Sequence, residues 1–156
     1  MGLYNIDVNA RTIGDLVFNW AQLKKAPNGP LVMGVFTEEV GVGSVAAAIV
    51  LVAWGYPSRI RSEAAFAALA GASPLPASSG TTIRYQLNRG GDRKLNRVLN
   101  VIAMHRMVHH QDTRYYVDKR LAQGKTYREI RRSLKRYLAR RYYRHLNNEM
   151  EAKDKG

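Results

Sequence analysis

Positive charge in this 156-residue chain is concentrated in one segment, and that segregation limits what the chain can fold into and bind. Residues 1–80 hold five basic and five acidic side chains, whereas residues 81–146 hold eighteen basic and four acidic ones. Residues 147–156 hold two basic and three acidic side chains. Because the whole excess of +13 lies in one segment, the pattern predicts a surface that binds a polyanion. A solvated basic face without a specific partner is the alternative.

Length and composition predict one compact intracellular domain. The chain is long enough for a core of its own. It has no cysteine, so neither a disulfide framework nor a thiolate metal site is available. The start of the sequence has no signal-peptide pattern, and the most apolar run, residues 45–54, is too short to cross a bilayer. We therefore expect a cytoplasmic, nucleoid-associated protein with no membrane partner.

Hydrophobic periodicity predicts a mainly α-helical fold. Helices are expected after Gly43, from the N-cap Ser62, from the N-cap Asp92, and from about Asp112 to Gly124. Alternation of apolar and polar residues over 83–87 predicts a short extended segment. The expected organisation is a poorly defined segment at 1–39, a helical domain at 40–146 and a flexible tail at 147–156.

The helix expected after Thr126 has the strongest pattern in the chain. Thr126 and Glu129 form a capping box, and an apolar stripe follows through Tyr127, Ile130, Leu134, Tyr137, Leu138 and Tyr142. Such a helix can pack with one face and lie along a nucleic-acid backbone with the other. A membrane-surface helix is the alternative, which the tyrosine-rich stripe disfavours. The basic positions predicted to bind nucleic acid here are Arg128, Arg131, Arg132, Lys135 and Arg136.

A glycine pair at Gly41 and Gly43 precedes the first expected helix. It resembles the hairpin of helix-hairpin-helix modules, in which glycines let the backbone approach a phosphate beside a helix N-terminus. A tight turn feeding a buried helix is an equally good interpretation, because a lone Gly-x-Gly is a weak signal.

Residues 74–80, PLPASSG, lie on the boundary between the neutral and the basic parts of the chain. Two prolines and small residues predict a rigid turn, in which serines are most often ordinary turn residues. The basic residues that follow closely, and that we expect to contact nucleic acid, are Arg84, Arg89, Arg93 and Lys94.

Histidines at 105, 109 and 110 suggest a metal site, since His105 and His109 are four residues apart. A zinc site needs further ligands, and neither cysteine nor a group of acids accompanies them. We expect surface or phosphate-facing histidines and no metal site.

Four stretches together resemble the C-terminal domain of the bridge-RNA-guided DEDD insertion-sequence transposases, the IS-one-ten family. The resemblance covers about residues 40–146, in the right order and with the right intervals. The stretches are 66–80 (FAALAGASPLPASSG), 87–96 (LNRGGDRKLN), 124–129 (GKTYRE) and 134–140 (LKRYLAR).

The resemblance implies a serine that attacks a DNA phosphodiester and forms a transient phosphoserine link. The family motif places this serine at Ser79, followed by Gly80, with Ser78 as the nearest competitor. A serine hydroxyl needs a base or metal to become a good nucleophile. Arg84 and Arg89 are the closest cations in sequence for the charge of the transition state.

The chain departs from the family at its N-terminal side. The family has an RNase H-like domain of the RuvC type, whose four acids hold metal, and residues 1–39 are too few for it. Ile6-Asp7-Val8 resembles its first strand, which makes Asp7 a candidate vestige of the acid set. We therefore expect an N-terminally truncated chain without a cofactor of its own. Mg²⁺ is expected only with the missing domain, and this chain alone is expected to be inactive.

The resemblance, together with the basic segment, thus implies a DNA-binding domain for site-specific transposition of a bacterial mobile element. The resemblance implies guide RNA as a second partner and homo-oligomers in the full-length family. Two other classes stay open: a non-catalytic nucleic-acid-binding remnant or regulator, and a basic RNA-structural protein of ribosomal type.

Overall fold

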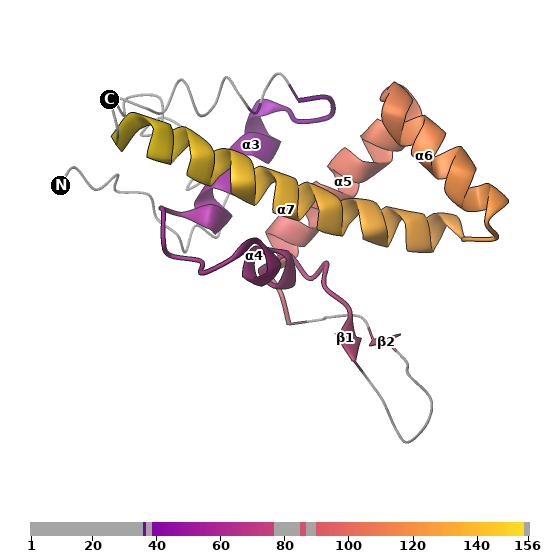
Figure 1. The fold of residues 1–156 in the computed structure, drawn as a ribbon, viewed down its shortest axis with the longest axis horizontal. Coiled ribbons are helices and arrows are strands. Elements are labelled where there is room, and N and C mark those ends of the chain that lie inside the picture. Colours follow the sequence, from indigo (N-terminus) through magenta and orange to yellow (C-terminus); the bar gives the residue numbers. More distant parts are fainter. Residues whose placement is uncertain (1–35, 37–38, 77–84, 87–89, 155–156) are drawn as a thin grey trace.

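Helices dominate the part of the chain that the structure describes. The computed structural model describes residue 36 and residues 39–76, 85–86 and 90–154. Its helices are α3 (Ser44–Trp54), α4 (Glu63–Leu69), α5 (Arg93–His109), α6 (Gln111–Ala122) and α7 (Tyr127–Asp154), with strands β1 (Leu75–Pro76) and β2 (Tyr85–Gln86) between α4 and α5 (Figure 1). The prediction of a mainly α-helical fold is confirmed.

Helix α7 runs through the whole body, and α4, α5 and α6 pack against it (Figure 1). Its packing face repeats every four residues through Ile130, Leu134, Leu138, Tyr142 and Leu146, all of which are buried. Two tyrosines of the predicted stripe do not belong to it, since Tyr127 and Tyr137 are 63% and 49% exposed. These two tyrosines lie beside the buried row, where each lines a hollow in the surface.

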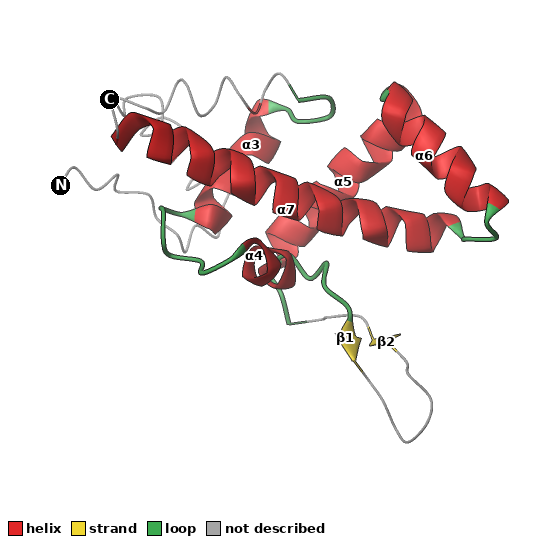
Figure 2. Ribbon diagram, in the orientation of Figure 1, coloured by secondary structure: helices red, strands yellow, loops and turns green. Residues whose placement is uncertain are grey.

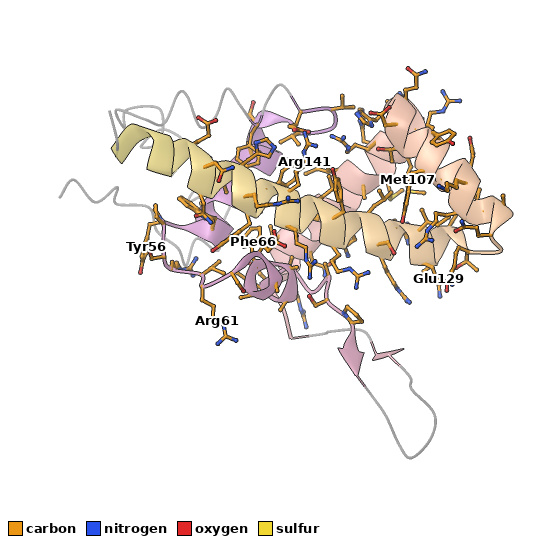
Figure 3. The ribbon with its side chains drawn as sticks, in the orientation of Figure 1. Tyr56, Arg61, Phe66, Met107, Glu129 and Arg141 are labelled. Carbon is orange, nitrogen blue, oxygen red and sulfur yellow. The ribbon has the colours of Figure 1, made fainter. Side chains whose placement is uncertain are left out.

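Helices α3 and α4 contribute many of the buried apolar side chains of the core. α3 is buried almost all round from Ala47 to Trp54, and Gly55, at a φ of 80°, ends it. Phe66 of α4 is fully buried and lies between α4 and α7 (Figure 3). The Ser62 hydroxyl accepts a hydrogen bond from the Ala65 amide at 3.2 Å, so the predicted cap is confirmed.

Helices α5 and α6 form an angled pair (Figure 2). The Asp92 carboxylate caps α5 by accepting from the Leu95 amide at 3.0 Å, as predicted. α6 starts at Gln111, slightly before the predicted start, because the His110 imidazole acts as its cap. The Nδ1 atom of His110 accepts from the Thr113 amide at 3.2 Å.

The capping box at the start of α7 is confirmed. The Thr126 amide donates to Glu129 Oε2 at 2.8 Å, and the Glu129 amide donates to Thr126 Oγ1 at 3.3 Å. The backbone hydrogen bond from Thr126, followed by its side-chain bond, lowers the pKa of Glu129.

Helix α7 continues to Asp154, past the predicted domain end at 146. The three predicted domain boundaries stay predictions.

The strands β1 and β2 pair antiparallel, with Leu75 opposite Gln86 and Pro76 opposite Tyr85. This ribbon lies away from the helical body, beyond α4 and α5 (Figures 1 and 2). Ser78, Ser79, Arg84 and Arg89 belong to the connection between the strands or to the return toward α5, and lie outside the described residues. Within the described part of the chain, no helix is both long and apolar enough to span a membrane.

Candidate nucleic-acid interface

The ribbon of β1 and β2 leaves and rejoins the helical body where residues 69–71 lie against residues 91–92. We call this contact the neck. The Asp92 amide donates to the Leu69 carbonyl at 2.7 Å, which joins the start of α5 to the end of α4. A Cβ atom on Gly91 would lie 2.5 Å from the Leu69 oxygen and 2.7 Å from the Gly71 nitrogen. Only glycine permits this approach of two backbones. The neck therefore fixes where the serine-bearing segment departs from the body.

The Asn96 side chain ties this neck to α7. Its amide nitrogen donates to the Ala70 carbonyl at 2.8 Å, and its oxygen accepts from the Lys135 ammonium at 2.7 Å. One side chain of α5 thus joins the end of α4 to the middle of α7.

A groove of about 560 Å³ lies beside the neck. We call it the neck groove. One wall consists of residues 71–74, which lead into β1, together with Asn96. The other wall is formed by the end of α6, the turn after it and the first turns of α7. The basic side chains lining it are Arg120, Lys125, Arg132, Lys135 and Arg136.

The neck groove has a strong excess of positive charge. Its only lining acid among the described residues is Glu129, whose carboxylate already accepts from Thr126. Arg132 and Arg136 form no salt bridge with any described residue. Since positions 128, 132, 135 and 136 share one side of a helix, Arg128 lies on the same side of α7 and is exposed to solvent.

The surroundings of Lys135 disfavour the charged form of its side chain. Burial is the main reason that the pKa of Lys135 is lowered, and the nearby charges of Arg131 and Arg132 add to the effect. The opposite charge of a bound anion in the groove would offset both effects. This is the electrostatic state expected of a site that receives a phosphate.

The remaining predicted contacts are dispersed. Arg131 faces a different hollow, beside Met104 and Tyr127. Arg93 and Lys94 lie in the first turn of α5, next to the neck, but do not line the groove. From the predicted set, the structure therefore gathers Arg132, Lys135 and Arg136 in the groove, with Arg128 on the same side of α7. Arg93, Lys94 and Arg131 do not line it, and Arg84 and Arg89 lie outside the described residues.

The lining residues that were not predicted as contacts include Asn96, Arg120 and Lys125. Asn96 and Lys125 lie inside stretches that carry the family resemblance, which was the available signal. Arg120 had no such signal. The structure orients its guanidinium over the Tyr116 ring, 5.6 Å from the centroid, and by a bond to the Gln123 oxygen at 3.0 Å.

A second and larger cavity, about 780 Å³, lies on another side of α7. Glu39, one of its lining residues, bridges two arginines. Arg106 Nη1 lies 3.0 Å from Glu39 Oε2, and Arg141 donates to Glu39 Oε1 from Nε at 3.1 Å and also from Nη2. We call these three residues the Glu39 cluster. Figure 3 shows Arg141 on the upper edge of α7 and Glu129 below its first turns.

The Glu39 cluster is largely buried, and its two arginines share a single carboxylate. The Arg106 side chain is 7% exposed and that of Glu39 15%. Burial alone would raise the pKa of Glu39, but the hydrogen bonds and charges of Arg141 and Arg106 together lower it. Asp112 adds a second acid to the lining of this cavity. The cluster holds the segment before α3 against α5 and α7, which is a structural role.

The glycine turn before α3 packs on α5. Gly41 has a φ of 88°, and a Cβ atom there would lie 3.2 Å from His105 Nδ1. Gly43 caps α3 without any side-chain hydrogen bond, and Gly43, Ser44 and Val45 are exposed. The first helix of a helix-hairpin-helix module would fall outside the described residues, so this module stays a prediction.

His105 and His109 form a pair on the surface of α5, with ring centroids 4.4 Å apart. Both side chains are exposed. Across the described part of the chain, no three His, Asp or Glu side chains come together as metal ligands would. The described residues therefore do not fit the metal that the family resemblance implies, and we assign no step to a metal held by them.

Comparison with known sequences identifies the family of this chain. A model of the Transposase IS116/IS110/IS902 family matches residues 35–118, more than half of the chain. The chain belongs to this family. It is also similar to a protein of Streptomyces coelicolor named "Insertion element IS110 uncharacterized 43.6 kDa protein", with 37% identity over 94 residues.

That similarity covers 60% of this chain but only 23% of the Streptomyces protein, so the chain spans about a quarter of this relative. The predicted family is confirmed at this level. The family match includes the neck, Asn96 and the ribbon, whereas α7 with Lys135 lies beyond it.

Proposed function

We propose that this chain is a DNA-binding domain of an insertion-sequence transposase. In this proposal the neck groove holds the DNA backbone beside the segment that carries Ser79. The observation that supports it best is the grouping of five cations around the exit of the ribbon. Backbone phosphates supply most of the affinity in such interfaces, through side chains of this kind.

The proposed reaction is the transfer of a DNA phosphoryl group to the hydroxyl of Ser79. As the bond between Ser79 Oγ and phosphorus forms, the bond between phosphorus and a sugar oxygen breaks. The hydroxyl proton leaves to a base, and the departing sugar oxygen takes up a proton. The cations of the groove hold the neighbouring phosphates in register, which is a positioning contribution. In the complete enzyme, the RNase H-like domain with Mg²⁺ would supply the activation of the hydroxyl.

Guide RNA and homo-oligomers are proposed on the family resemblance alone. The neck groove suits the phosphates of DNA and of RNA alike, because its cations recognise backbone rather than bases. Competition between element-end DNA and a structured RNA at fixed salt distinguishes the two.

A non-catalytic regulator of the element is the second candidate function. It is supported by the five cations that the described residues place in the neck groove, because such cations can bind a phosphate backbone without any chemical step. Such a protein would bind the DNA or RNA of the element and compete with an active transposase.

A covalent-adduct assay separates these functions. Labelled element-end DNA is incubated with Mg²⁺ and the chain, alone or with an added RNase H-like domain of the family, and resolved on a denaturing gel. An adduct lost in Ser79→Ala but kept in Ser78→Ala supports the nucleophile. Binding without any adduct supports the regulator. No binding at all contradicts both.

A further inference from the structure

We propose that Lys135 binds a backbone phosphate where the ribbon of β1 and β2 leaves the helical body. Asn96 is the residue that positions the Lys135 ammonium for this contact. This inference rests on the proposed function and names the residues through which the groove and the ribbon are kept in register. The family comparison assigns a role to neither residue.

The hydrogen bonds of Asn96 leave its side chain one orientation. Its NH₂ group donates to the Ala70 carbonyl and its oxygen accepts from Lys135, so an exchanged amide would place two donors against each other. Ala70 follows α4 directly, and five residues later the chain forms β1. The Lys135 ammonium is therefore held at a fixed place relative to the start of the ribbon.

The Lys135 ammonium has hydrogen-bonding capacity left over. It carries three N–H donors, and the bond to Asn96 engages one of them. It forms no other hydrogen bond with the described residues, and Lys135 and Asn96 both line the neck groove. Two donors of a cation thus remain for the oxygens of a phosphate in the groove.

The electrostatic environment supports the same assignment. Burial and the charges of Arg131 and Arg132 disfavour the protonated form of Lys135, and no carboxylate among the described residues pairs with it. A phosphate would relieve it, so binding of DNA should raise the pKa of Lys135. Asn96 itself carries no charge, which leaves the full charge of Lys135 to the ligand.

Binding of a 20-base-pair duplex, followed by fluorescence anisotropy over a range of NaCl concentrations, tests the lysine. Lys135→Met should weaken binding about fivefold to tenfold and reduce the slope of log K against log salt by about one. Lys119→Met removes an equivalent charge from an exposed position on α6 and should leave both quantities nearly unchanged.

Two variants of Asn96 test the positioning role. Asn96→Asp places a carboxylate on Lys135, which should raise the pKa of that lysine in the free protein and weaken DNA binding at least as much as Lys135→Met. Asn96→Ala keeps the cation but releases it from the neck. The duplex should then still bind with an unchanged salt slope, while the NMR shifts that DNA induces at the Ala72 and Ser73 amides should be lost.

The outcomes are distinct. Wild-type protein that binds DNA, combined with Lys135→Met that keeps the same affinity and salt slope, would overturn this inference and leave the proposed function standing. Unchanged DNA-induced shifts in Asn96→Ala would overturn the role of Asn96. Failure of the wild-type protein to bind would overturn the proposed function and this inference together. Circular dichroism of each variant checks that its helices are intact.

Discussion

The neck groove and the Glu39 cluster lie on two sides of the same helix and use arginine and lysine in opposite ways. In the cluster, Arg106 and Arg141 share one carboxylate that is mostly removed from water. In the groove, Arg132, Lys135 and Arg136 face open space without a salt bridge to any described residue. Cations enclosed with an acid stabilise the fold, whereas cations without one remain available to an external anion.

Two pKa shifts express the same difference. The cluster lowers the pKa of Glu39, which means that the fold favours the charged form of this acid. The groove lowers the pKa of Lys135, which means that the fold disfavours the charged form of this base. The charge of Glu39 is stabilised within the protein, whereas the charge of Lys135 would be stabilised by an external anion.

The largest expected effect is on the cluster. Glu39→Gln should lower the free energy of unfolding by about 3 kcal/mol, because it leaves Arg106 buried without a countercharge. Urea denaturation at neutral pH measures this loss. Adding Arg106→Met should recover much of it. An unchanged urea midpoint in Glu39→Gln would remove the distinction between the two sites.

The neck should be the next most sensitive place. Gly91→Ala introduces a Cβ atom 2.5 Å from the Leu69 carbonyl oxygen, and relief of this contact must separate α4 from α5. We expect a loss of about 2 kcal/mol in unfolding free energy and, because the groove wall moves, weaker DNA binding. Gly43→Ala, where a Cβ atom meets nothing within 4 Å, is the matched control. Equal stability of the two variants would show that the neck is not tightly closed.

Acid should weaken the cluster specifically. A lowered native pKa means that the contribution of Glu39 is complete above its ordinary pKa of 4.5 and is lost as the pH falls through the lowered value. The difference in unfolding free energy between wild type and Glu39→Gln should therefore shrink between pH 5 and pH 3. Other carboxylates titrate in both proteins and cancel in this comparison. A constant difference would contradict the assignment.

The smallest expected effect on stability belongs to the groove. Replacing Arg132, Lys135 and Arg136 together by glutamine should change the free energy of unfolding by about 1 kcal/mol or less, because these cations have no acidic partner in the described structure and only the hydrogen bond from Lys135 to Asn96 is lost. Thermal denaturation of the triple variant checks this. A loss comparable to that of Glu39→Gln would mean that the groove is part of the structural framework.

Local signals in the sequence predicted most of the helical fold. The caps at Ser62, Asp92 and Thr126 each concern residues three apart, so they can be read without knowledge of the tertiary structure. The burial of Tyr127 and Tyr137 was predicted wrongly, since the face that a helix buries depends on which neighbours pack against it.

The candidate site was predictable only in part, because its walls come from distant segments. The charge pattern identified Arg132, Lys135 and Arg136, but nothing local indicates that Asn96 reaches both Ala70 and a lysine 39 positions later. In the same way, Glu39 and Arg141 are 102 positions apart. Which arginines are neutralised within the fold is a property of tertiary packing and could not be read from the charge pattern.

The most direct test of the account compares two triple variants that remove equal charge. One carries Arg132→Gln, Lys135→Gln and Arg136→Gln in the groove, and the other carries Arg61→Gln, Arg114→Gln and Lys119→Gln at exposed positions elsewhere. The measurement is the affinity for a 20-base-pair DNA duplex as a function of NaCl concentration. If the groove cations hold the backbone, the groove variant should lose at least about tenfold in affinity and roughly two to three units of salt slope, while the exposed variant should lose little. Equal losses in the two variants would contradict it.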